Sequence, residues 1–358
     1  MMSSLDDARR ALGVPGAPGT GVLIETSGTT GEAKRVRLSS GALRASAEAS
    51  HARLGGPGQW LLALPTTYIA GANVLVRSVI AATEPVVMPA GHFTARDFAD
   101  CVALMTGARR YSSLVPVQLA RLVEGAQYDD AVRSSVATLD AILVGGQASG
   151  DQLLARAREL GWKIVVTYGA TETCGGVVYD GAPLDGSKVR IISGEIWIGG
   201  STLAVGYERA DGSPDTAQTQ ARFTELDGER WYRTDDAGEF EVSGAFAGEL
   251  VRVTGRRDRV IISGGIKVSL LGIEAVVRTV PGVADCVAAA IPNEEWGQRP
   301  ILGVECDPGV VVSQRDVERA IETALGHVSV PDVIVFGSLP RNENGKPDTR
   351  ALTASIRR

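Results

Sequence analysis

The stretch from Thr26 to Lys34 combines glycines and small hydroxyl-bearing residues with one lysine. Glycines let the backbone approach an anion closely, and hydroxyls, backbone amides and a lysine ammonium all favour phosphate oxygens. The apolar residues Val22–Ile24 just before it predict a buried strand that would hold this loop. It is not a Walker loop, because no Gly-Lys-Ser/Thr follows the first glycine at the required spacing. The stretch therefore predicts a polyphosphate site or, on composition alone, a solvated polar turn.

Five further segments carry residues suited to binding a nucleotide. One, Val144–Gln147, ends a predicted strand in a glycine pair, on which a flat ring could lie. Another, Tyr168–Thr173, contains Glu172, and a carboxylate is the ligand that Mg²⁺ prefers where it bridges phosphates. The remaining segments are Tyr232–Asp236, Gly255–Asp258 and Pro340–Arg350. Each one alone fits an ordinary turn better than a functional site, so their combined order carries the argument.

In this order, the segments resemble the motifs of the adenylate-forming superfamily of acyl-CoA synthetases, peptide-synthetase adenylation domains and luciferases. The resemblance covers nearly the whole chain. It implies that ATP and Mg²⁺ are bound, that Glu172 holds the metal, that Thr171 bonds the α-phosphate and that Asp236 accepts the ribose hydroxyls. The residues that it implies for ATP or AMP are Thr26, Ser27, Gly28, Thr29, Thr30, Gly31, Lys34, Gly145, Gly146, Gln147, Tyr168, Gly169, Asp236 and Arg256.

The resemblance also implies a reaction in two steps. A carboxylate attacks the α-phosphate of ATP to give an acyl-adenylate and pyrophosphate, and a thiol then displaces AMP. Lys346 would stabilise the charge that develops in the first step, in a catalytic set with Thr171 and Glu172. Between the two steps, a small C-terminal domain would rotate about a hinge at Asp258.

That rotation would bring the segment Ser263–Lys267 to the site in place of Lys346. Its two glycines, Gly264 and Gly265, would leave a narrow path for the pantetheine arm of coenzyme A, with Ser263 and Lys267 on either side. On residue type alone, the glycine pair can also be explained as only a tight turn, and this alternative stays open.

Within the superfamily, the chain is similar to short actinobacterial members, the o-succinylbenzoate–CoA ligases of menaquinone biosynthesis. The stretches that carry this similarity are Gln59–Ala81, Ser113–Leu122 and Ala170–Gly186. The phosphate loop begins near the start of the sequence, so we expect this chain to lack the N-terminal subdomain of typical superfamily members. Two residues depart from the pattern: Tyr68 stands where a histidine is usual, and Asp235 where a glycine is usual.

The similarity implies an acid substrate with two carboxylates, of which the succinyl one is activated. The residues expected around this acid are Tyr68, Arg77, Val115, Thr173, Gly175 and Gly176. Arg77 is the only cation on its predicted helix, and it would compensate the aromatic carboxylate if that group is desolvated. On composition alone, Arg77 instead extends its charged end into solvent.

Two alternatives to an o-succinylbenzoate–CoA ligase stay open on the sequence. One is an adenylating enzyme that activates another aryl or acyl acid for CoA, a carrier protein or an amine, and the change at Tyr68 would suit it. The other is a non-catalytic nucleotide-binding relative. The presence of Lys34, Glu172 and Lys346 argues against that second alternative.

The hydrophobic pattern predicts the elements that must position these residues. Up to Val166, short apolar strands alternate with helices, which predicts a large α/β domain of parallel strands. From Lys188, short strands joined by glycine-rich turns predict a small antiparallel barrel, and the polar segment 210–224 is typical of a mobile surface loop. A small α+β domain is expected after the hinge, so that the predicted domains are 1–257 and 258–358.

Composition narrows the class of function. The 358 residues carry a formal net charge of −6, which disfavours a nucleic-acid binder. The four cysteines are scattered and only three histidines are present, which indicates neither a zinc site nor a disulfide framework. No segment has the length and apolarity of a membrane span or a signal peptide, so we expect a cytoplasmic protein. A homodimer is expected only by analogy with related proteins.

Overall fold

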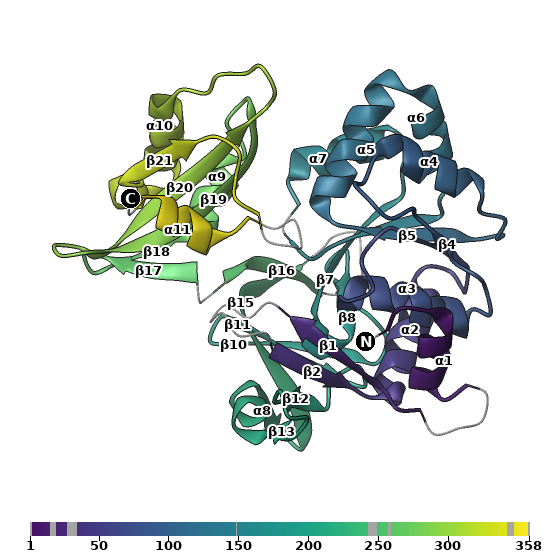
Figure 1. Ribbon diagram of the computed structural model, residues 1–358. Coiled ribbons are helices and arrows are strands. Elements are labelled where there is room, and N and C mark those ends of the chain that lie inside the picture. Colours follow the sequence, from purple (N-terminus) through teal and green to yellow (C-terminus); the bar gives the residue numbers. More distant parts are fainter. Residues whose placement is uncertain are drawn as a thin grey trace. The chain divides into compact units, whose positions relative to one another are not determined.

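The computed structural model describes residues 2–14, 19–26, 34–147, 149–242, 249–256, 259–341 and 347–356, without the side chains of Val242 and Lys267. The chain divides into two compact units (Figure 1). Unit 1 comprises Met1–Thr234 and Glu239–Arg252, and unit 2 comprises Asp235–Gly238 and Val253–Arg358. The predicted boundary at Asp258 lies outside the described residues and stays a prediction.

A seven-stranded sheet with the strand order β4-β3-β5-β6-β7-β8-β9 forms the centre of unit 1. Its first five strands are parallel, as the alternating pattern predicts. The next strand, β8, is antiparallel to β7, and β9 is antiparallel to β8. The strands are β3 (Gln59–Leu62), β4 (Val86–Val87), β5 (Arg110–Leu114), β6 (Ala141–Val144), β7 (Ile164–Ala170), β8 (Gly175–Tyr179) and β9 (Ala182–Pro183). Open parallel sheets bind ligands at the carboxyl ends of their strands, so the loops after β3, β5, β6 and β7 form the edge where a site is expected.

Helices cover both faces of this sheet (Figure 1). One face carries α1 (Leu5–Leu12), α2 (Ser40–Arg53) and α3 (Ile69–Ile80), which bury apolar side chains in one core. The other carries α4 (Ala95–Ala103), α5 (Pro116–Tyr128), α6 (Asp130–Ala137) and α7 (Asp151–Glu159) around a second core. The Ser39 side chain caps the start of α2, as the pair Ser39 and Ser40 predicts, and the Thr94 side chain caps the start of α4.

Two further sheets carry other motif residues. A four-stranded antiparallel sheet has the order β1-β2-β12-β13, with strands β1 (Val22–Thr26), β2 (Lys34–Leu38), β12 (Gly206–Glu208) and β13 (Pro214–Asp215). A five-stranded sheet joins β10 (Ser187–Ile192), β11 (Glu195–Gly200), β14 (Phe223–Leu226), β15 (Glu229–Val242) and β16 (Glu249–Arg256). The strands predicted after Lys188 are present, and their closure into a barrel stays a prediction.

The prediction of a mobile loop over 210–224 is wrong. This segment contains β13 and the helix α8 (Thr216–Arg222), and it ends in the first residues of β14. The side chain of Asp215 caps α8 by accepting a hydrogen bond of 3.0 Å from the Gln218 amide. Phe223 is buried between the rings of Tyr207 and Tyr232, with ring centroids 6.1 and 5.2 Å away. One helix cap and one buried aromatic ring therefore order a segment whose polar composition resembles a loop.

Unit 2 is the small α+β unit that the sequence predicts. Its sheet has the order β18-β17-β20-β19, and β21 pairs with β20. The strands are β17 (Val260–Ser263), β18 (Ile266–Ser269), β19 (Val283–Asn293), β20 (Gly297–Cys306) and β21 (Val333–Phe336), and the helices are α9 (Leu270–Val277), α10 (Gln314–Leu325) and α11 (Thr349–Ile356). In the part of the chain that the structure describes, no helix has the length and apolarity needed to cross a membrane.

Candidate functional site

The two described ends of the predicted phosphate loop lie side by side. Thr26 is the last residue of β1 and Lys34 the first residue of β2, and the two are paired across the hairpin. The Thr26 hydroxyl donates a hydrogen bond of 3.5 Å to the Lys34 carbonyl oxygen. The hairpin therefore holds both ends of the loop in place. The residues Ser27–Gly31, predicted to bind ATP, lie outside the described residues.

The predicted nucleotide glycines are placed at the carboxyl ends of β6 and β7. Gly145 follows β6, and a Cβ there would lie 2.3 Å from the Thr167 hydroxyl oxygen. Gly169 lies near the end of β7, where a Cβ would come within 2.0 Å of the Gly175 carbonyl oxygen. Gly146 and Gln147 follow Gly145 and are exposed, and Tyr168 lies beside Gly169 on β7. Close backbone approach therefore requires glycine at Gly145 and Gly169 whatever ligand the edge binds.

Glu172 lies in a short helical turn, η1 (Thr171–Thr173), directly after β7. Its side chain is buried, and its Oε1 accepts a hydrogen bond of 2.7 Å from the hydroxyl of Tyr207. Burial, followed by the nearby Glu172 carboxylate, raises the pKa of Tyr207 above its ordinary value, so the phenol stays protonated at neutral pH. This contact could not be predicted from the sequence, because Tyr207 lies 35 positions further along the chain.

The turn after Glu172 is closed by Thr173, which is fully buried. Its hydroxyl oxygen accepts a hydrogen bond of 2.9 Å from the Ala170 amide and lies 2.8 Å from the Gly175 carbonyl oxygen. A Cβ on Gly175 would lie 2.5 Å from the side-chain nitrogen of Asn73 on α3. The first turns of α3 therefore pack directly on the residues from Thr173 to Gly176 that were predicted to contact the acid.

Arg77 is buried in unit 1, with 4% of its surface exposed, so the hypothesis that it reaches solvent is wrong. Its guanidinium lies over the ring of Trp60, 4.7 Å from the centroid, and donates a hydrogen bond of 3.2 Å to the Tyr179 hydroxyl. Its Nε is buried with no hydrogen-bond partner, and no carboxylate among the described residues forms an ion pair with it. A buried cation without an acidic partner is a suitable counter-charge for an anionic ligand.

The charge of Arg77 also acts on its buried neighbours. Burial raises the pKa of the Cys174 thiol to about 12, and the positive charge of Arg77 opposes that rise. Burial and, secondly, the charge of Arg77 lower the pKa of His51 to about 4. Cys174 lies between Thr173 and Gly175, so the charge of Arg77 acts on the turn predicted to contact the acid.

Two other residues predicted to contact the acid begin helices at the carboxyl edge of the sheet. The apolar pattern of the sequence predicts a helix from Ala72, whereas α3 starts at Ile69 and has Tyr68 as its N-cap. Val115 is the N-cap of α5, and a Cβ on Gly146 would lie 3.8 Å from its Cγ1. Gly176 is the second residue of β8. The edge therefore brings together residues from β3–α3, β5–α5, β6 and β7–β8.

Asp236 and Arg256, which come from two separate predicted motifs, form an ion pair in unit 2 with 3.3 Å between Nη1 and Oδ1. The preceding residue, Asp235, has a φ of 62° and so occupies the left-handed region that favours glycine. Aspartate is one of the few other residues that tolerate this region, so the replacement of the usual glycine keeps the turn.

The predicted coenzyme A segment forms the turn of the β17–β18 hairpin. Gly264 and Gly265 have φ of 56° and 80°, and Ser263 pairs with Ile266 across the turn. The two glycines therefore form a tight turn, and whether this turn also binds coenzyme A stays a prediction. Lys346, Asp258 and the side chain of Lys267 lie outside the described residues.

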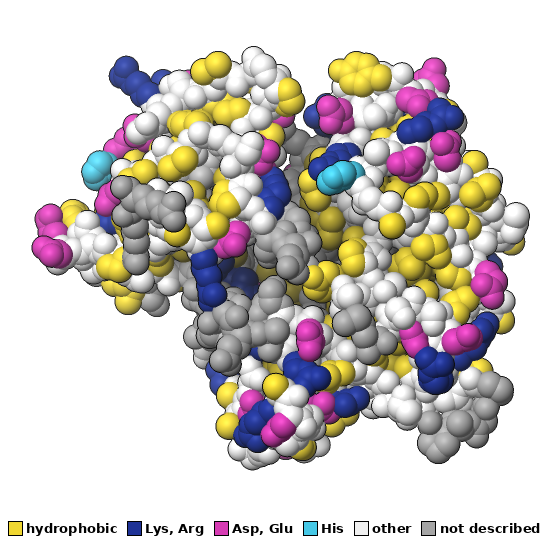
Figure 2. Space-filling model, viewed as in Figure 1, with side chains coloured by type: hydrophobic (Ala, Val, Ile, Leu, Met, Phe, Trp, Pro, Cys, Tyr) yellow, Lys and Arg dark blue, Asp and Glu magenta, His cyan; other side chains and the backbone are white. Residues whose placement is uncertain are grey.

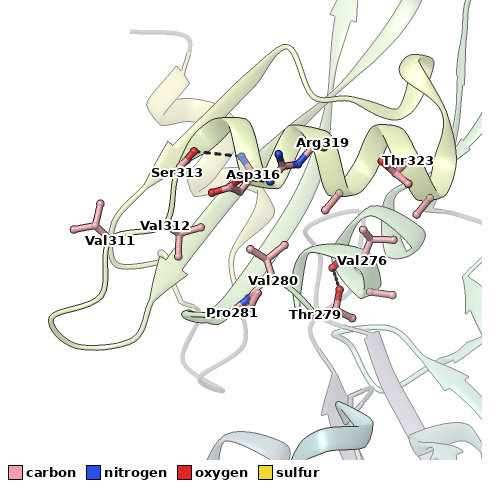
Figure 3. Close-up of a pocket in the computed structure, with 13 residues that line it drawn as sticks. Val276, Thr279, Val280, Pro281, Val311, Val312, Ser313, Asp316, Arg319 and Thr323 are labelled. Atoms are coloured by element: carbon pink, nitrogen blue, oxygen red, sulfur yellow. Dashed lines mark hydrogen bonds and ion pairs between the residues drawn. The ribbon is translucent and has the colours of Figure 1, made fainter.

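Unit 2 also has a pocket of about 880 Å³ between α9 and α10 (Figure 3). Its lining is mostly apolar, with the charged side chains of Asp316 and Arg319 at α10. None of the residues predicted for ATP, the acid or coenzyme A line it. The described residues contain no group of three or more His, Cys, Asp or Glu side chains that could hold a metal alone. A cation at Glu172 would need ligands from the nucleotide, which is the usual way that Mg²⁺ is bound with ATP.

Comparisons with known proteins match both units. The model of the AMP-binding enzyme family matches residues 20–208, and that of the AMP-binding enzyme C-terminal domain matches residues 272–346. The chain is 40% identical over 335 residues to a probable 2-succinylbenzoate–CoA ligase of Mycobacterium tuberculosis, which covers 92% of this chain and 83% of that protein.

Two solved structures of o-succinylbenzoate CoA synthetase from Bacillus subtilis are also similar. One is in complex with an acyl-adenylate intermediate, with a TM-score of 0.76 and 26% identity over 94% of this chain and 69% of that one. The other is in complex with ATP and magnesium ion, with a TM-score of 0.75 and 26% identity over 94% of this chain and 70% of that one.

Proposed function

The chain belongs to the AMP-binding enzyme family, and we propose that it is an ATP-dependent acid–thiol ligase that forms o-succinylbenzoyl-CoA through an acyl-adenylate, in menaquinone biosynthesis. The 40% identity to a relative of that probable activity supports the substrate. The structural observation that carries the proposal is Arg77, a buried guanidinium without an acidic partner among the described residues. Its positive charge acts on Cys174, within the turn from Thr173 to Gly176, and suits a substrate with a second carboxylate that is not activated.

In the first step, the succinyl carboxylate oxygen attacks the α-phosphorus of ATP. A new O–P bond forms and the bond to pyrophosphate breaks. Arg77 would hold the aromatic carboxylate, and Lys34 and Thr26 with the loop between them would hold the polyphosphate. Lys346 would stabilise the charge that develops at the reacting oxygens.

In the second step, the sulfur of coenzyme A, as a thiolate, attacks the acyl carbon. The C–S bond forms, and the C–O bond to AMP breaks. We propose that the turn at Gly264 and Gly265 provides the path for the pantetheine arm, and that Asp258 is the hinge between the two steps. Asp236, oriented by its ion pair with Arg256, would accept the ribose hydroxyls.

The residues around Glu172 fit Mg²⁺. The carboxylate is buried, Tyr207 occupies only its Oε1 in the described residues, and no lysine or arginine forms an ion pair with it there. Mg²⁺ commonly takes one or two protein carboxylates and completes its ligands with phosphates and water. Bound there, the metal would neutralise charge on the phosphate oxygens of ATP.

The proposal includes a cytoplasmic location and a homodimer. On the face in Figure 2, basic and acidic side chains are interspersed, which suits small-molecule partners better than a nucleic acid. Sedimentation of the purified protein tests the dimer.

A panel of aromatic and aliphatic acids tests the activity, with AMP release and thioester formation measured with and without coenzyme A. We expect o-succinylbenzoate to give its CoA thioester and one AMP per thioester. Activation of a different acid, or transfer only to a carrier protein or an amine, would replace this substrate with another. Binding of ATP without acid-dependent pyrophosphate exchange would indicate a non-catalytic relative.

A further inference from the structure

Tyr207 lies outside all of the predicted motifs and forms a hydrogen bond with Glu172. The hydroxyl of Tyr207 donates to Glu172 Oε1 over 2.7 Å, and the two residues are 2% and 8% exposed. The backbone of the same segment is attached as well, since the Ala204 amide donates to the Glu172 carbonyl oxygen over 2.8 Å. The contact therefore joins η1 to β12 by both a side chain and the main chain.

The position of this hydroxyl is itself fixed from several sides. Tyr207 is paired with Val36 of β2, the strand that begins at Lys34. Its amide donates to the Thr219 hydroxyl over 3.0 Å, and its ring packs against Phe223 with centroids 6.1 Å apart. A ring held in this way offers a hydrogen-bond donor at one point in space.

We propose that Tyr207 is the positioning residue for Glu172: it holds Oε1 and so directs the other carboxylate oxygen to the metal that accompanies ATP. The inference rests on the proposed role of Glu172 in binding Mg²⁺. A ligating carboxylate is usually oriented by a hydrogen bond from a neighbouring group, and loss of that neighbour typically weakens metal binding about 10–100-fold. Without the phenol, the buried carboxylate would lose its only side-chain donor among the described residues.

The test is Tyr207→Phe, with Tyr111→Phe as the matched control. Tyr111 is equally buried, and its hydroxyl donates to the carbonyl oxygens of Leu54 and Gly56 at 3.0 Å, away from Glu172. Binding of Mn²⁺ to the complex with α,β-methylene-ATP is followed by electron paramagnetic resonance. We expect Tyr207→Phe to weaken Mn²⁺ binding about 10-fold and to leave metal-free AMP binding unchanged. Tyr111→Phe should behave like the parent in both measurements.

Parent-like Mn²⁺ affinity in Tyr207→Phe, or an equal loss of AMP affinity, would overturn the inference. In the Glu172→Gln background, Tyr207→Phe should have no further effect on Mn²⁺ binding. If the losses of the two substitutions add, Tyr207 does not act through Glu172. If Tyr207→Phe does not fold, Glu172→Asp keeps the charge but withdraws it from the phenol, and parent-like Mn²⁺ affinity there would equally overturn the inference. These measurements need no acid or coenzyme A, so their outcome does not depend on whether the proposed ligase activity is correct.

Discussion

Arg77 places a positive charge inside unit 1 with only a tyrosine hydroxyl and an indole ring as side-chain partners among the described residues. Arg77→Met keeps most of the volume and removes the charge. If Arg77 compensates the aromatic carboxylate of the substrate, kcat/KM for o-succinylbenzoate should fall on the order of 10²-fold, because an uncompensated buried carboxylate is costly. Steady-state kinetics with this acid and with an analogue lacking the aromatic carboxylate measure the effect.

The analogue should be used almost equally well by variant and parent. Arg190→Met is a matched control, since the Arg190 guanidinium lies 4.8 Å from the centroid of Trp231 but at the surface, paired with Asp227. It should show parent-like kinetics. Equal losses for both acids in Arg77→Met would mean that Arg77 supports the fold and not the substrate.

The same charge affects stability through His51. Burial first, and Arg77 second, lower the pKa of this histidine to about 4 from an ordinary 6.5. The unfolded chain therefore binds a proton that the folded chain excludes, and folding free energy is lost as the pH falls from 6.5 towards 4. A shift of this size corresponds to about 3 kcal/mol, as an order of magnitude.

Urea denaturation at several pH values measures this loss. His51→Gln should flatten the decrease between pH 6.5 and 4, whereas His327→Gln, at an exposed position, should not change it. An unchanged slope in His51→Gln would show that other groups cause the acid sensitivity.

At the scale of elements, the β17–β18 turn offers two glycines with different surroundings. A Cβ on Gly264 would lie 2.5 Å from the ring of Trp296, while one on Gly265 would meet nothing within 4 Å. Both have positive φ, so alanine is strained at either position. Gly264→Ala should therefore lower the free energy of unfolding of unit 2 by about 1–3 kcal/mol more than Gly265→Ala does.

On the proposed function, both variants should slow thioester formation from a supplied acyl-adenylate and leave adenylate formation nearly unchanged. Melting curves and the two half-reactions, measured separately, decide this. If both half-reactions slow together in Gly265→Ala, the turn is only a structural feature and not a path for coenzyme A.

The elements themselves could largely be predicted from the sequence, because their signals are local. The apolar run of β6 and the Ser39 cap of α2 are present within a few residues of where they act. The first turn of α3 was missed because its N-cap, Tyr68, makes no capping hydrogen bond with its side chain. The sequence predicts two short strands, Trp231–Tyr232 and Glu239–Val242, where the structure has the single strand β15, in which Asp235 adopts a φ of 62°.

The contacts within the candidate site could not be predicted in the same way. Tyr207 and Glu172 are 35 positions apart, and Arg77 and Tyr179 are 102 positions apart. Only the folded sheet brings these pairs together, so no spacing in the sequence reports them. The resemblance to a family supplied the roles of Glu172 and Arg77 but not the neighbours that hold them.

The whole molecule consists of two units, each with its own buried cores. The chain passes between the units within β15 and again within β16. If the proposed alternation is right, a catalytic residue of the small domain, residues 258–358, can serve one half-reaction only. Lys346, in the C-terminal segment, is the residue for which this separation should be largest.

Lys346→Ala should slow adenylate formation on the order of 10²–10³-fold, because a positioned cation would be lost from the developing phosphate charge. Transfer to coenzyme A from a pre-formed acyl-adenylate should stay close to the parent rate, since the lysine would have left the site by then. Lys163→Ala is the control, because Lys163 is an exposed lysine paired with Asp140 on unit 1 and should leave both half-reactions unchanged. Pyrophosphate release and thioester formation, each followed in a single turnover, separate the two steps. If the lysine instead stayed at the reacting centre throughout, its replacement by alanine would slow both steps alike. That outcome would exclude the proposed alternation of the small domain between the two half-reactions.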